Sequence, residues 1–344
     1  MFLFASATLA PLALLILGAL WGGWWIMAGI AVMTLFTWAG DHLTRHAAAA
    51  SGDEAEFPSG DGLATALALL LLAGLALAVR AFGAGFAGLE LAGLLVGWGL
   101  AFGQIGHPVA HELIHRGARG MRLLGRALYA AVLMGHHASS HLRVHHLHVG
   151  TNDDPASAPL GMGFWTYAPR AWAGSFMAGL RAETALRARA GRPAPGWTHP
   201  YVGHGLGAAV ALLLAYGLAG WPGVAGLVGI AAYAQVQILL SDYVQHYGLR
   251  RQLLPDGRLE AVGPCHSWNA PQRWSGAMTL HAPRHSDHHA HPARPYPALR
   301  LEAGMPLLPR SLPVMAVAAL VPPLWRRMMD RRALRWSAQV RSLE

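Results

Sequence analysis

The feature that most constrains the fold of this chain is a set of six apolar runs, each close to the length that crosses a lipid bilayer as a helix. A spanning helix needs about 20 mostly apolar residues. Of the 344 residues, 54% are hydrophobic and only 12% are charged, about half the charged fraction of an ordinary soluble domain. The sequence therefore predicts an all-α integral membrane protein, with spans at about 4–20, 23–39, 63–82, 86–105, 201–218 and 223–240.

The arginines indicate which ends of these runs face the cytoplasm. They cluster after the fourth run, from Arg116 to Arg126, and again from Arg250 to the end of the chain, whereas the turn between the fifth and sixth runs is uncharged. Basic residues concentrate on the cytoplasmic side of membrane proteins. We therefore expect one domain, 1–344, with both termini in the cytoplasm together with the polar stretch 41–61 and a histidine-rich helical cap built from segments 107–200 and 241–310.

Two further compositional facts limit the class of protein. The net charge of +9 could suggest nucleic-acid binding, but the arginines flank apolar runs, so we expect contact with a membrane surface and no nucleic acid. The one cysteine, Cys265, excludes an internal disulfide and a metal site made of cysteines alone.

The apolar stretch 314–325 contains Pro322 and Pro323 and is short, which favours an interfacial or re-entrant segment over a seventh span.

Of the 20 histidines, nine lie between His107 and His148, after the fourth run, and seven between His246 and His291, after the sixth run. Residues four apart on a helix share a face, so the spacing in HELIHR, in SHLRVHH and in RHSDHHA predicts a chelating group in each segment. Imidazole binds iron, zinc, copper and nickel, whereas magnesium and calcium prefer oxygen. The three segments together supply eight histidines: His111, His115, His141, His145, His146, His285, His288 and His289.

So many imidazoles exceed the needs of one ion, which favours a dinuclear centre. A reducing cytoplasm and the lack of thiolate ligands favour ferrous iron. HELIHR also contains the zinc-protease pattern HExxH, with Glu112 as its general base. That interpretation needs a single cluster and leaves the other two segments unexplained.

Four segments carry a resemblance to a known family: HELIHR, SHLRVHH followed by DDPAS, DYVQHYGL, and PRHSDHHA. They resemble the histidine boxes of the membrane-bound alkane monooxygenases, a branch of the fatty-acid desaturase/hydroxylase superfamily. Their order, their spacing and their placement after the fourth and sixth spans agree with that family, from about Phe86 to the PPLW near the C-terminus. RHSDHHA and HYG are the most specific parts, because they separate the alkane/xylene branch from ordinary desaturases.

The resemblance implies a di-iron enzyme that uses O2 and a rubredoxin-like electron donor with its reductase, in a bacterial inner membrane. The implied reaction inserts oxygen into a terminal methyl C–H bond of a medium-chain alkane, or of a similar hydrophobic small molecule from the membrane, and gives a primary alcohol. The implied metal ligands are nine: His111, His115, His141, His145, His146, His246, His285, His288 and His289.

Departures from the family pattern leave the substrate open. Arg116 stands where the family often has Lys, Ser140 and Val144 replace the usual Glu and Gly of the second box, and Pro283 precedes Arg284 in the third. None of these removes a ligand. The alternatives are therefore a xylene-type hydroxylase of methyl aromatics, a fatty-acyl or carotenoid desaturase or hydroxylase and, as a non-enzyme, a membrane metal transporter.

Other polar residues near the boxes could support the metal. Metal-bound histidine usually donates its second N–H to a carboxylate or a carbonyl, which makes Glu112, Asp154, Asp242 and Asp287 candidates for that role. His107 lies four residues before His111, but Pro108 disfavours helical geometry at His107. The sequence does not decide whether metal is also bound by His107, His136, His137, His148, His281 or His291.

Overall fold

The computed structural model describes residues 1–44, 60–191 and 195–341, and these residues fold into helices and loops. Within these ranges no β-strand forms; only two isolated bridges occur, Leu253–Leu259 and Asn269–Leu307. The apolar helices are α1 (Phe2–Trp21), α2 (Trp24–Ala31) continued by η1 (Val32–Phe36) and α3 (Thr37–Leu43), α4 (Asp61–Ala81), α5 (Gly88–Ala101) continued by η2 (Phe102–Gly106) and α6 (His107–Ile114), and α11 (Pro200–His246).

The remaining helices are shorter or more polar. They are α7 (Arg119–Ala131), α8 (His137–Ser140), η3 (His141–His145), α9 (His146–His148), α10 (Phe164–Arg189), η4 (Gly196–Thr198), η5 (Pro264–His266), α12 (Arg273–Met278), α13 (His285–Ala290), η6 (Tyr296–Ala298), α14 (Leu312–Ala319) and α15 (Pro322–Arg341). The expected interfacial stretch 314–325 is thus divided between α14, which is too short to cross a bilayer, and the start of α15.

Five helical stretches are long and apolar enough to cross a membrane: 2–21, 24–43, 61–81, 88–114 and 200–246. Inside the protein only 28–50% of their most apolar windows is buried. Large apolar side chains of these helices are exposed, among them Trp24, Leu69 and Leu213, as expected of helices that face lipid. The expectation of an all-helical protein is confirmed for the described residues, and five of the helical stretches are candidate membrane spans.

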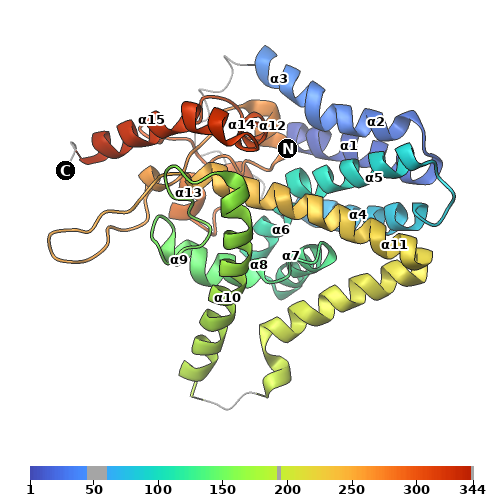
Figure 1. Cartoon of the computed structure of the whole chain (residues 1–344), viewed down its shortest axis with the longest axis horizontal. Coiled ribbons are helices and arrows are strands. Elements are labelled where there is room, and N and C mark those ends of the chain that lie inside the picture. Colours follow the sequence, from blue (N-terminus) through green and yellow to red (C-terminus); the bar gives the residue numbers. More distant parts are fainter. Residues whose placement is uncertain (45–59, 192–194, 342–344) are drawn as a thin grey trace.

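All six expected spans overlap these five stretches, and the last stretch contains two of them. In α11 the backbone leaves helical geometry at Ala219 (φ −150°, ψ 17°) and at Gly220 (φ 62°, ψ −150°). Glycine populates positive φ at little cost, and Pro222 restarts the helix after it. The two halves of α11, yellow and gold in Figure 1, therefore meet at a sharp bend.

The apolar helices pack side by side and end at one region of the molecule. α1 packs against α2 and α4, and α11 packs against α4 and α5. Close approach needs small residues: a Cβ at Gly74 of α4 would lie 2.0 Å from the Trp98 ring of α5. In Figure 1 these helices lie to the right, whereas α9, α10, α13 and the far end of α15 lie to the left.

The fourth apolar helix is longer than its sequence predicts. It does not end at residue 105 but continues through the π-helical turn η2 into α6, which carries the first histidine segment. The expectation that Pro108 disfavours helical geometry at His107 is wrong, since His107 has φ −62° and ψ −53°. We attribute this to η2: a π-helical turn locally shifts the i→i−4 hydrogen-bond register, so that the proline ring is accommodated.

Candidate metal centre

The structure gathers histidines into two adjoining groups near the ends of α6 and α11. The five-histidine group consists of His111, His115, His141, His146 and His288, and the four-histidine group of His145, His246, His285 and His289. Within each group one ring nitrogen from every member lies within 4.8 Å of the others. The nine residues implied by the family resemblance are the nine in these groups. Whether they bind metal stays a prediction.

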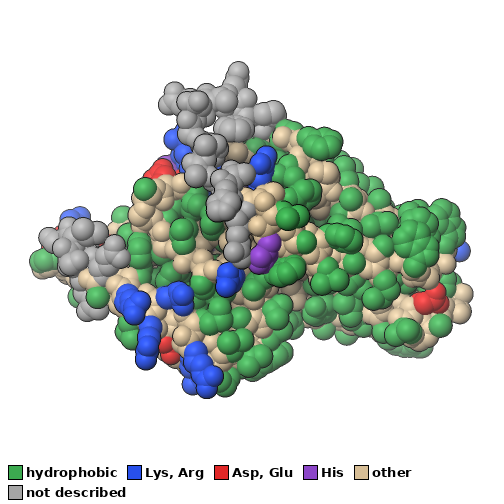
Figure 2. Space-filling model, turned by 90° about the horizontal axis from the view of Figure 1, so that it is seen from above, with side chains coloured by type: hydrophobic (Ala, Val, Ile, Leu, Met, Phe, Trp, Pro, Cys, Tyr) green, Lys and Arg blue, Asp and Glu red, His purple; other side chains and the backbone are tan. Residues whose placement is uncertain are grey.

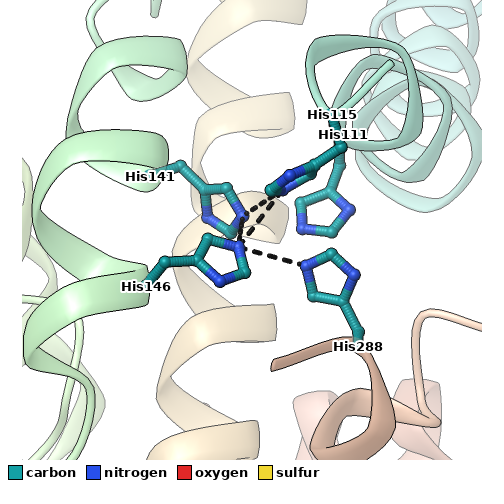
Figure 3. Close-up of side chains that lie close together, drawn as sticks. All are labelled: His111, His115, His141, His146 and His288. Carbon is teal, nitrogen blue, oxygen red and sulfur yellow. Dashed lines mark hydrogen bonds between the residues drawn. The ribbon is translucent and has the colours of Figure 1, made fainter. Parts of the chain in front are cut away.

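Ring nitrogens face one another in the five-histidine group (Figure 3). The Nε2 atom of His146 lies 2.9 Å from that of His141 and 3.2 Å from those of His115 and His288. His115 and His141 are also 3.2 Å apart through Nε2. The Nε2 atom of His111 is buried and has no hydrogen-bond partner among the described residues.

This arrangement fits a metal ion. Two imidazole nitrogens that bind one metal at about 2.1 Å, at right angles to each other, lie about 3 Å apart. A ring nitrogen must be unprotonated to bind metal. Burial and the neighbouring histidines together lower the pKa of His115 to about 4 and that of His146 to about 2, so these rings are neutral at pH 7.

The four-histidine group is more deeply enclosed, because all four side chains are buried. The Nε2 atom of His285 lies 3.0 Å from that of His246 and 3.2 Å from that of His289. The His145 ring lies beside them, 4.6 Å from the His246 ring between centroids, and its buried Nε2 has no hydrogen-bond partner among the described residues. The donor set here is again imidazole alone.

Two groups outside the four-histidine group orient its rings. The Asp154 carboxylate lies 2.9 Å from Nδ1 of His145 and also accepts the hydroxyl of Ser157 at 2.6 Å. Burial favours the neutral form of His145, but the charge and hydrogen bond of Asp154 outweigh it and raise the His145 pKa. The carbonyl of His266 lies 3.4 Å from Nδ1 of His246. Both contacts occupy Nδ1, which leaves Nε2 free for a metal.

The second histidine segment divides between the two groups because of a π-helical turn. We expected His141 and His145 to share one site, and this is wrong. The His146 N–H bonds to the carbonyl of His141, five residues earlier, so His141 and His146 point to the five-histidine group. His145 turns to the other group. The third segment divides as well: His285 and His289, four apart, join one group and His288 the other.

The histidines left open by the sequence lie outside both groups. The Nδ1 atom of His107 is 3.0 Å from the Tyr129 hydroxyl, and its ring is 6.0 Å from the His111 ring. The His137 ring stacks 5.6 Å from the His141 ring. His136, His148, His281 and His291 also belong to neither group.

The four candidate carboxylates have different positions. Asp154 is the one that hydrogen-bonds a grouped histidine among the described residues. Glu112 accepts hydrogen bonds from Arg116 and from the Tyr296 backbone N–H, which fix α6 against the segment around Tyr296. Asp287 accepts from Arg294 and from the backbone N–H of Arg300, which fixes the loop after α13. Asp242 is buried and lines a small space with His137, His145 and Asp154.

Two supporting groups could not be found from the sequence. The first is the carbonyl of His266, because a backbone acceptor leaves no mark in the residue pattern. The second is Tyr129, 22 residues after the His107 that it contacts. Both depend on tertiary packing.

An apolar cavity of about 460 Å³ lies beside the histidine groups. Residues from α2, η1, α3, α5, η2, α6, α11 and α14 line it. His107 lies in its wall, one helical turn before His111. Several wall residues are exposed, among them Leu35, Trp38 and Val317, so the cavity opens onto the apolar surface of the protein.

A model of the fatty acid desaturase family matches residues 84–318, which include both histidine groups. The chain is also similar to alkane 1-monooxygenase 1 of Pseudomonas aeruginosa, with 37% identity over 239 residues that cover 69% of this chain and 62% of the relative. Alkane 1-monooxygenase 2 of Alcanivorax borkumensis is 33% identical over 242 residues, 69% of this chain and 63% of the relative.

A third relative, whose name states an aromatic substrate, has lower sequence identity to this chain. The xylene/toluene monooxygenase hydroxylase component XylM of Pseudomonas putida is 28% identical over 257 residues, 72% of this chain and 65% of the relative. The chain thus spans less than two thirds of the length of these relatives.

Proposed function

Because this chain belongs to the fatty acid desaturase family, we propose that it is a membrane-bound hydroxylase with a histidine-held di-iron centre. Its reaction inserts one oxygen atom of O2 into a terminal methyl C–H bond of a medium-chain alkane, or of a similar hydrophobic molecule, and gives a primary alcohol. The other oxygen atom leaves as water, with two electrons from the donor and two protons. The observation that carries the proposal is the pair of adjoining histidine groups in a chain similar to alkane 1-monooxygenases.

In this proposal the grouped histidines hold the metal, and the side chains that line the apolar cavity hold the substrate. Iron in the two groups would bind O2 and activate it with two external electrons. The nine imidazoles hold the ions, and Asp154 keeps His145 in the tautomer that presents Nε2. The buried four-histidine group keeps water away from the reaction. The apolar cavity aligns the chain so that its end lies near His107, next to the five-histidine group.

The proposed topology has six spans, with two of them in α11. The arginines after the fourth span and after Arg250 support a cytoplasmic place for both termini and for segments 107–200 and 241–310, in a bacterial inner membrane. Residues 45–59, most of the polar stretch 41–61, lie outside the described residues. The bend at Ala219 and Gly220 supports a hairpin that returns the chain to the histidine groups.

The electron donor we propose is a rubredoxin-like protein, served by its reductase. α15 carries five exposed arginines, and its far end projects away from the apolar helices (Figure 1). Figure 2 shows basic side chains gathered at the end of the molecule opposite the hydrophobic surface. A hollow beside Trp336 is lined by Arg250 and Arg251 and reaches His266, whose carbonyl contacts the grouped His246. An acidic donor docked there would lie close to the four-histidine group.

Reversing charge on α15 tests this docking surface. The double change Arg331→Glu and Arg332→Glu should slow reduction of the metal centre by an acidic donor about ten-fold at low salt, with a smaller effect at high salt. Reduction by a small uncharged reductant should not change. An equal rate with the protein donor would place its docking surface elsewhere.

Similarity to XylM supports one second candidate, hydroxylation of a methyl group on an aromatic ring. Family membership also leaves a fatty-acyl or carotenoid substrate to be tested. Membership of this enzyme family favours an enzyme over a metal transporter. Two tightly bound irons per chain, with no metal transport in proteoliposomes, would reject the transporter.

Product analysis tests the proposed function. Membranes that contain the protein, supplied with electron donor, reductase and ¹⁸O2, are incubated separately with decane, xylene and a fatty acid. We expect 1-decanol with one ¹⁸O atom as the main product. Oxidation of xylene alone would select the second candidate. Formation of only an alkene from the lipid chain would reject the hydroxylase.

A further inference from the structure

The wall of the apolar cavity contains one carboxylate and neither lysine nor arginine. Asp41, near the end of α3, is the acidic residue among the cavity-lining side chains, and His107 is the only other ionisable group there besides Tyr233. A carboxylate in so apolar a wall is costly unless it is held by donors or serves the ligand.

One of the two carboxylate oxygens of Asp41 has a structural role. Its Oδ1 accepts the backbone N–H groups of Trp274 and Ser275, at 2.9 and 3.0 Å. These contacts fix α12 against α3, and the Asp41 side chain is only 5% exposed. The other oxygen, Oδ2, is buried and has no hydrogen-bond partner among the described residues. The capping role therefore explains one oxygen and leaves the other unsatisfied.

A second unsatisfied acceptor lies in the same wall. Oε1 of Gln104, from η2, is buried without a hydrogen-bond partner among the described residues, and Gln104 lines the cavity too. Both groups accept hydrogen bonds, so a ligand that offers a donor suits them and a ligand that brings a negative charge does not.

The size of the charge effect can be judged from Coulomb's law. Two like charges about 6 Å apart, at an effective dielectric constant of about 20, disfavour occupancy by roughly 100-fold, and screening at the cavity mouth reduces this. No Lys or Arg in the cavity wall offsets the repulsion. The cavity thus accepts uncharged chains and rejects a fatty-acid carboxylate of equal length.

We propose that Asp41 is a specificity-determining residue that restricts the cavity to uncharged hydrocarbon chains and their alcohols and excludes fatty acids. This rests on the proposed function in one respect, that the cavity is the substrate site. It adds to that function a reason why a member of the fatty acid desaturase family acts on a chain without a carboxylate.

Photolabelling tests the proposal without turnover. Two ten-carbon probes with a diazirine at the same carbon, one an alcohol and one a carboxylate, are cross-linked to the full-length protein in nanodiscs of zwitterionic lipid. Labelling of cavity residues is measured by mass spectrometry and normalised to labelling of the lipid. We expect the alcohol to label the cavity at least about ten-fold more than the carboxylate.

The matched variants separate charge from structure. Asp41→Asn removes the charge but keeps an oxygen that can accept the N–H groups of Trp274 and Ser275, and it should narrow the labelling ratio to within about three-fold. Asp256→Asn changes an exposed carboxylate outside the cavity and should keep the wild-type ratio. A wild-type ratio near one, or an Asp41→Asn ratio equal to that of the wild type, would overturn the proposal.

The labelling experiment and the test of the proposed hydroxylase function can fail independently of each other. If Asp41→Asn does not fold, the wild-type ratio alone still decides, since a value near one contradicts the role of Asp41. Labelling needs neither iron nor O2. A strong ratio in a protein that makes no 1-decanol would support Asp41 and reject the hydroxylase, whereas 1-decanol formation with a ratio near one would do the reverse.

Discussion

The five-histidine and four-histidine groups differ in how their rings are held. Three of the five histidines in the first group are only partly buried, and no carboxylate hydrogen-bonds any of the five among the described residues. All four histidines of the second group are buried, with Asp154 fixing His145 and the carbonyl of His266 beside His246. The four-histidine group thus has fewer candidate ligands, but more of its rings have hydrogen-bond partners that orient them.

This difference suggests a division of roles. A metal with fewer protein ligands keeps more positions open for an outside molecule, as catalytic metal sites do. Each remaining ligand then matters more, and its orientation must be fixed by neighbours. On this account the four-histidine group tolerates changes less well than the five-histidine group.

Loss of the ligand from α11 should have the largest effect. His246→Ala removes a quarter of the four-histidine set, and hydroxylation should fall by more than the roughly 10- to 100-fold that loss of an outer partner costs. Iron content should drop from two ions to one while the protein still inserts in the membrane. Product formation and metal analysis check this, and a fully active His246→Ala protein would remove the residue from the ligand set.

Removing the support of His145 should have a smaller effect. Asp154→Asn takes away the charge that orients this ring, so metal affinity at the four-histidine group should weaken about 10- to 100-fold while the other group is unaffected. Asp153→Asn changes the exposed neighbour and serves as the control. Iron titration of both variants measures the difference. Equal weakening in both groups would contradict separate support.

Chelation should distinguish the groups by access. The five-histidine group is partly exposed, so a water-soluble chelator should remove its ion about ten-fold faster than the ion of the enclosed group, because release requires solvent to reach the ligands. Iron content followed against time should fall in two phases. A single phase for both ions would mean that they are equally accessible.

A histidine outside both groups should have the smallest effect. The His291 side chain is about half exposed and contacts Asp287, not a grouped histidine. His291→Ala should change activity and iron content by less than about two-fold, as most surface changes do. A larger loss would show that the third histidine segment contributes a ligand that neither group includes.

Much of this arrangement could be predicted from the sequence, because it depends on composition and spacing. The apolar runs and the low charge identify the membrane helices, and the boxes identify the nine grouped histidines. The assignment of each histidine to a group could not be predicted. It depends on the π-helical turn after Ser140, where the hydrogen-bond register changes and His141 pairs with His146 in place of His145.

Contacts between distant segments were also beyond the sequence. Asp41 contacts the backbone of Trp274, 233 residues away, and lines a cavity that exists only once α3, α11 and α14 have assembled. The helical geometry of His107 was predicted wrongly because the rule for residues before proline takes no account of a neighbouring π-helical turn. In each case the missing information is tertiary or concerns hydrogen-bond register.

Mössbauer spectroscopy with metal analysis, on anaerobically purified full-length protein loaded with ⁵⁷Fe, tests the central claim most directly. The account predicts two irons per chain and two unequal quadrupole doublets of equal area, one from each histidine group. One zinc per chain, or a single iron with one doublet, would contradict it.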